Sequence, residues 1–208
     1  MAQLPDGNGP GFESLRERVR TALQLGVESP AVEFKAGVSW DTLRISIIKT
    51  VLAMSNLQYG GLIIVGRPES SNSQDGINPA ELATFDLDVM RDQFDSFASP
   101  RAVVSIARVK IGTHTYVVID VAEFEEDIVI CKKDQLPELA LKKGTVYIRP
   151  FHGRPRSVPV SNAEEMRSVI ELAVDKSEQR FGGRAKRRGF VRQRASASAY
   201  EAEVSELP

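Results

Sequence analysis

The sequence has few of the residues that build disulfides, zinc sites or membrane spans. Cys131 is the one cysteine among 208 residues, so no internal disulfide can form, which fits a reducing compartment. The two histidines, His114 and His152, lie in separate segments, so we do not expect a zinc site. The strongest apolar run, 62–65, is much shorter than the roughly 20 residues of a membrane-spanning helix, and residues 1–13 lack the basic and apolar regions of a signal peptide. We therefore expect a cytoplasmic protein without a membrane partner.

The chain also has almost no net charge. Its 27 Lys and Arg residues nearly balance 28 Asp and Glu residues, which gives a formal net charge of −1 at pH 7. No global field therefore attracts nucleic acid, and any such attraction has to come from a local cluster. The composition is that of a soluble globular protein, and the length suits one domain with tails. We expect a disordered tail at 1–11, one domain at 12–173, and a flexible tail at 174–208 that is first basic and then acidic.

Apolar spacing within 12–173 alternates between the periods of helices and strands. Helical spacing predicts helices at 12–25, from Asp41 to about Leu57, and at 164–174, where Ser161 and Glu164 form a capping box. Strand patterns occupy 32–35, 62–65, 103–111, 115–124, 128–133 and 145–150. This order predicts an α/β domain with a mixed sheet and helices packed on at least one of its faces.

The stretch ESPAVEFK, residues 28–35, places charged side chains on a short strand. Val32 and Phe34 alternate with Glu33 and Lys35, so one face of the strand is buried and the other carries charge. Ser29-Pro30 interrupts the strand and allows Glu28 to fold back toward Glu33. Such a charged face is most often simply the side of a strand that is exposed to water, and the alternative is that it contributes to a site.

Three stretches in this order are typical of Schlafen proteins and their prokaryotic relatives: ESPAVEFK, VLAMSNLQYGGLIIVGRPE and KKGTVYIRPFHGRPRSVPVSNAEEM. The sequence resembles the single AlbA-type nucleic-acid-binding domain of prokaryotic and viral members over about residues 26–172. The residues that match the family pattern are Glu28, Glu33, Lys35, Ala53, Asn56, Gly60, Gly61, Asp75, Gly76, Ile77 and Arg149. Two departures are evident: Ser55 and Leu57 replace the usual Ala and Thr, and Arg67-Pro68-Glu69 replaces an acidic pair.

The resemblance implies a metal-dependent endoribonuclease acting on structured RNA such as tRNA. Its catalytic residues would be Glu28, Glu33, Glu69 and Lys35, with the three glutamates holding Mg²⁺ or Mn²⁺ and the lysine facing a phosphate oxygen. Arg67 is placed to pair with one of these carboxylates and occupy it. The alternative is a non-catalytic module, either a DNA-binding regulator or a protein-interaction domain whose carboxylates form structural ion pairs.

The Gly60-Gly61 pair admits a structural role and a phosphate-binding role. A glycine pair at the end of a helix usually stops the helix and turns the chain into the next strand. No Gly-Lys-Ser/Thr follows this pair, so we expect neither a P-loop nor ATP binding. Asn56, just before the turn, is expected to bond to the backbone of that turn.

Basic residues gather in two places. RPFHGRPR offers Arg149, Arg154 and Arg156 for phosphates and Phe151 for stacking on a base. The C-terminal tail adds a second basic cluster, either a nucleic-acid contact or a solvated run of charge: Arg184, Lys186, Arg187 and Arg188. RNA is favoured over DNA as the partner, and a homodimer would supply the second RNA-clasping lobe that the larger Schlafen proteins have.

Overall fold

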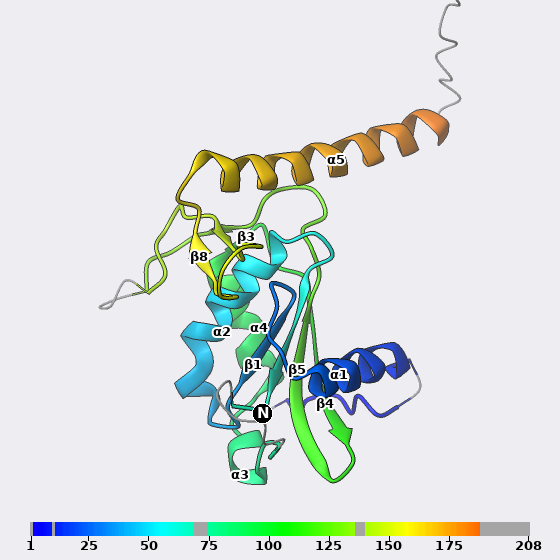
Figure 1. Ribbon diagram of the computed structural model, residues 1–208, viewed down its shortest axis with the longest axis vertical. Coiled ribbons are helices and arrows are strands. Elements are labelled where there is room, and N and C mark those ends of the chain that lie inside the picture. The colour runs from blue at the N-terminus through cyan, green and yellow to red at the C-terminus, as the bar shows by residue number, and fades with distance from the viewer. Residues whose placement is uncertain (1, 10, 69–74, 136–139, 188–208) are drawn as a thin grey trace, which may run out of the picture. The chain divides into compact units, whose positions relative to one another are not determined.

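The computed structural model describes residues 2–9, 11–68, 75–135 and 140–187, with the side chains of 182–187 excepted (Figure 1). The helices are α1 Glu13–Leu25, α2 Trp40–Ser55, α3 Pro79–Leu82, α4 Leu87–Phe97 and α5 Ala163–Arg187. The strands are β1 Val32–Lys35, β2 Gly61–Val65, β3 Ala98–Ser99, β4 Val104–Ile111, β5 His114–Val121, β6 Ile130–Cys131, β7 Tyr147–Ile148 and β8 Val158–Pro159. The chain divides into two compact units, residues 1–173 and 174–208. Within the described part of the chain, no helix has the length and apolar character needed to cross a bilayer.

A mixed four-stranded sheet forms the centre of the first unit, in the order β1-β2-β5-β4. β1 runs parallel to β2, and the β2–β5 and β5–β4 pairs are antiparallel. The two remaining pairs, β3–β6 and β7–β8, are short and antiparallel. The predicted α/β class with a mixed sheet is therefore confirmed, and β1 lies at the edge of the main sheet.

Helices cover both faces of this sheet (Figure 1). On one face, Leu15, Val19 and Leu23 of α1 pack against Phe34 of β1 and against Leu62 and Ile64 of β2. On the other face, α2 and α4 share one apolar cluster with alternate residues of β2, β4 and β5. Alternation along a strand thus sends neighbouring side chains into two separate cores.

Ordered structure begins earlier than the sequence predicts. The amide of Arg108 in β4 donates to the Pro5 carbonyl at 2.9 Å, and the amide of Gly7 donates back to the Arg108 carbonyl at 2.8 Å. Leu4 is buried in the core. The prediction of a disordered tail is therefore corrected for residues 2–9. Backbone hydrogen bonds to the edge strand β4 and the burial of Leu4 hold this segment in place.

The last helix also differs from its prediction. α5 continues to Arg187, so the tail predicted from residue 174 is helical as far as that residue. The N-terminal cap of α5 lies one position later than the predicted pair of Ser161 and Glu164. The Asn162 side chain accepts a hydrogen bond from the Glu165 amide, and the Glu165 carboxylate accepts one from the Ser161 amide. Residues 188–208 lie outside the described residues.

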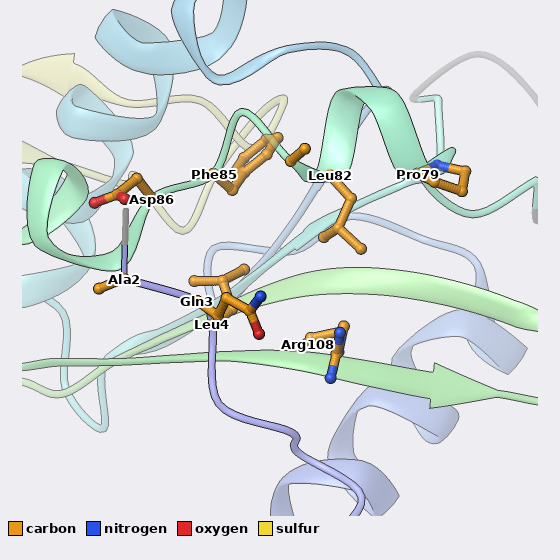
Figure 2. A pocket seen from close by; sticks show the side chains of 9 residues that line it. Ala2, Gln3, Leu4, Pro79, Leu82, Phe85, Asp86 and Arg108 are labelled. Carbon is orange, nitrogen blue, oxygen red and sulfur yellow. The ribbon is translucent and has the colours of Figure 1, made fainter.

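A pocket lies where the N-terminal segment meets the connection between α3 and α4 (Figure 2). Leu4, Leu82 and Phe85 form its apolar wall, with Asp86 and Arg108 as charged neighbours. Asp86 also caps α4, since one of its oxygens accepts from two amides of the first turn. None of the predicted site residues lines this pocket.

Candidate nucleic-acid interface

Glu28 folds back along the free edge of β1. The backbones of Ser29 and Val32 exchange two hydrogen bonds of 3.1 Å around Pro30 and Ala31. This tight reversal brings Glu28 beside the strand, where its Oε1 accepts from the Phe34 amide at 2.9 Å. The reversal predicted from Ser29-Pro30 is therefore present, and it satisfies an edge amide that the sheet leaves unpaired.

Glu33 is buried between two cations. Its Oε1 lies 2.6 Å from Lys35 Nζ, and its Oε2 lies 2.6 Å from Arg149 Nη1. Oε2 has no hydrogen bond of good geometry, so the contact with Arg149 is an ion pair. Glu33 is 6% exposed, because this face of β1 lies on the α2 side of the sheet and not in water. The interpretation of Glu33 as part of a wet strand face is wrong.

Arg149 connects several parts of the fold. Its Nη2 donates to the Ser29 carbonyl at 3.0 Å, and its Nη1 lies 3.4 Å from the Ser157 hydroxyl. That hydroxyl donates to Thr50 of α2 at 3.3 Å, and Thr50 donates to the Ser46 carbonyl at 3.0 Å. The sequence predicts Arg149 at a nucleic-acid surface. The structure corrects this prediction: the Arg149 side chain is completely buried and is not part of the surface.

Arg67 does not occupy a carboxylate among the described residues. Its guanidinium donates to the Leu23 carbonyl at 3.3 Å and the Gly26 carbonyl at 3.1 Å. It also lies over the Phe34 ring, 4.5 Å from the centroid. These carbonyls end α1 and lack helical partners, so a buried cation stabilises that end. Arg67 therefore joins α1 to β1 and leaves the glutamates to other partners.

Asn56 has the structural role predicted for it, with different partners. Its Nδ2 donates to the Val129 carbonyl at 2.8 Å and to the Tyr147 carbonyl at 3.0 Å, and its Oδ1 accepts from the Val129 amide at 2.8 Å. The amide thus joins the end of α2 to β7 and to the segment before β6. The expected bond to its own turn is replaced by these long-range bonds.

The segment between β7 and β8 carries the exposed part of the predicted basic cluster. We call residues 150–156 the basic turn. Phe151 is 70% exposed, and Arg154 and Arg156 are exposed as well. These three side chains, unlike Arg149, are accessible to a ligand. The backbones of Arg184, Lys186 and Arg187 belong to α5, their side chains are not described, and Arg188 lies outside the described residues.

The described carboxylates do not by themselves fit a divalent metal. Both oxygens of Glu33 already contact cations, so a metal ion there would have to displace Lys35 or Arg149. Among the described residues, no group of three His, Cys, Asp or Glu side chains is placed to hold a metal ion. Glu69, the predicted third ligand, lies outside those residues.

Comparisons with known proteins identify a family model and two distant structures. The family model described as Schlafen, AlbA_2 matches residues 28–153. The DIP2311 protein from Corynebacterium diphtheriae is 16% identical, with a TM-score of 0.48, and the match covers 75% of this chain and 29% of that one. The N-terminal domain of a RecG-related protein from Nitrosomonas europaea is 18% identical, with a TM-score of 0.39, over 72% of this chain and 90% of that one. This chain thus spans less than a third of the DIP2311 chain. No curated protein matches.

Proposed function

Since the chain belongs to the Schlafen AlbA_2 family, whose model matches residues 28–153, we propose that it binds nucleic acid through the basic turn. The observation that carries this proposal is the exposure of Phe151 beside Arg154 and Arg156. An exposed aromatic ring among arginines is typical of surfaces that stack on a base and hold its phosphates. Because the chain as a whole has a formal net charge of only −1, a local cluster such as this one would supply the electrostatic part of binding.

RNA is the proposed partner in preference to DNA. RNA offers unpaired bases in loops and bulges, and such bases stack on an exposed ring without the cost of opening a duplex. We also propose that two copies of the chain associate on RNA, because one domain presents one wall to the ligand. Sedimentation of the protein with and without RNA tests this second step, and a monomer bound to RNA would contradict it.

Fluorescence anisotropy with a labelled RNA hairpin, single-stranded RNA and duplex DNA tests the first proposal. We expect the double variant Arg154→Ala/Arg156→Ala to weaken binding and to reduce its salt dependence, by about 0.7 to 0.9 in log–log slope for each phosphate that is no longer neutralised. Phe151→Ala is expected to cost about 1–3 kcal/mol if one base stacks on the ring. Tyr59→Ala is the matched control, since Tyr59 is an aromatic residue that is 82% exposed outside the basic turn. Equal decreases in affinity for Tyr59→Ala and Phe151→Ala would contradict the proposal.

Metal-dependent cleavage of structured RNA is a second candidate. It would use Glu28, Glu33 and Glu69 as ligands of Mg²⁺ or Mn²⁺, with Lys35 facing the phosphate. The approach of Glu28 to the strand that carries Glu33 supports it, whereas the ion pair of Glu33 with Arg149 opposes it. End-labelled tRNA incubated with Mn²⁺, Mg²⁺ or EDTA tests it: this candidate predicts cleavage that needs metal and is abolished in Glu33→Gln while binding is retained. RNA that shifts on a gel and stays intact would contradict this candidate.

A further inference from the structure

We infer that Glu33 is a positioning residue, which holds the basic turn in its binding conformation through Arg149. This inference rests on the proposed binding of nucleic acid by that turn. It assigns Glu33 a role without contact to the ligand or to a metal ion, and it therefore predicts a different outcome from the cleavage candidate. Glu33 can have this role because of the way in which the two ends of the turn are held.

Arg149 and Ser157 are the residues that flank the basic turn. The Arg149 guanidinium lies 3.4 Å from the Ser157 hydroxyl, so one side chain bridges the base of the turn. The same base is closed by pairing of Ile148 in β7 with Val158 in β8. Phe151 follows Arg149 by two residues, which places their Cα atoms within about 7.6 Å of each other. A displacement of Arg149 would therefore be transmitted to Phe151.

Glu33 is the anion that keeps Arg149 in this position. The Arg149 side chain is fully buried and Lys35 lies nearby, with 11% of its side chain exposed. Without a negative charge at Glu33, the fully buried Arg149 guanidinium would lose this ion pair, and a buried cation deprived of its anion is strongly disfavoured. The guanidinium would then leave its bonds to Ser29 and Ser157. The base of the turn would loosen, and binding would have to order the turn again.

A set of four proteins tests this inference in EDTA, where no divalent ion contributes. Glu33→Gln keeps the shape of the side chain and removes its charge, and we expect it to weaken RNA binding at least tenfold. Arg149→Lys keeps the ion pair but lacks the fork that reaches Ser157, so it is expected to fold and still bind less tightly. Asp120→Asn is the control, because it removes another sheet carboxylate, paired with Arg18 at 2.7 Å on the α1 side. The wild-type chain is the reference.

Salt dependence separates positioning from direct contact. A positioning residue contributes no phosphate contact, so Glu33→Gln should lower affinity with an unchanged slope of log K against log salt, whereas Arg154→Ala/Arg156→Ala should reduce the slope. Wild-type affinity in EDTA for both Glu33→Gln and Arg149→Lys would overturn the inference and leave the proposed function intact. Should Glu33→Gln fail to fold, Arg149→Lys decides alone. If the Arg154→Ala/Arg156→Ala variant instead bound RNA with the same affinity and salt dependence as the wild-type chain, the proposed function would be refuted.

Discussion

Replacement of Asn56 by alanine is expected to cost far more stability than the removal of one polar side chain usually does. Its amide makes three hydrogen bonds to other segments, two with Val129 and one with Tyr147, and all of them are buried. In Asn56→Ala the Val129 amide and two carbonyl oxygens lose these partners. A buried polar group left without a partner costs about 1–3 kcal/mol, so with three such groups we expect the free energy of unfolding to decrease by at least about 3 kcal/mol. That is a large fraction of a typical stability of about 5–15 kcal/mol.

Urea unfolding followed by circular dichroism measures this decrease as a shift of the midpoint at constant m-value. Asn162→Ala is the matched control, because Asn162 caps α5 with one exposed hydrogen bond to the Glu165 amide. Removal of a cap costs about 0.5–2 kcal/mol, so the control should be clearly more stable than Asn56→Ala. A decrease below about 1 kcal/mol in Asn56→Ala would refute the reasoning, because it would mean that the freed backbone groups find other partners.

Three further predictions concern positions away from the basic turn. Gly60→Ala should lower the free energy of unfolding by more than about 2 kcal/mol in the same assay, since Gly60 has a φ of 68° and an added Cβ would lie 1.9 Å from a β5 carbonyl oxygen. Gly112→Ala is the control: Gly112 has a φ of 59° and no atom within 4 Å of an added Cβ, so this variant should show only the smaller conformational cost. Burial raises the pKa of the Cys131 thiol, so its alkylation should be much slower in the folded protein than in urea, and equal rates would contradict this. The hydrogen bond from Arg101 lowers the pKa of Asp95, so this pair stabilises the fold above the ordinary Asp pKa and loses its effect as pH falls through the lowered value. Asp95→Asn should therefore flatten the decline in stability in acid, as measured by midpoints at several pH values.

Local patterns in the sequence predict much of the sheet and its helices. The spacing that ends at Gly26 predicts α1, and the alternation over 32–35 predicts β1, because both signals depend only on neighbours in the chain. The strand patterns over 103–111 and 115–124 likewise predict two strands close together in the chain, and the structure pairs them as β4 and β5. Gly26, directly after the predicted helix 12–25, has a φ of 66° and ends α1 in the left-handed conformation that glycine adopts readily.

Long-range contacts account for the features that local patterns do not predict. Alternation along β1 places Glu33 on the face opposite Phe34, but it does not say which face is wet, since that depends on where α2 packs. Arg149 lies 120 positions from Ser29, whose carbonyl it contacts, and this contact has no counterpart in the local pattern of RPFHGRPR. Its place after the short apolar strand Tyr147–Ile148 is the one local signal that separates it from Arg154.

The charges around β1 bear directly on the choice between an anchored binding surface and a metal site. Among the described side chains at the edge and on the α2 side of β1, Glu28 and Glu33 contribute two negative charges, and Lys35 and Arg149 contribute two positive ones, so these four charges balance one another. A divalent cation at Glu33 would add two positive charges to a buried region and displace at least one cation from its partner. Such an exchange is favourable only where another anion, such as a carboxylate or a phosphate of the ligand, joins the site at the same time. Metal binding should therefore depend on bound RNA, whereas binding of RNA through the basic turn should not depend on metal.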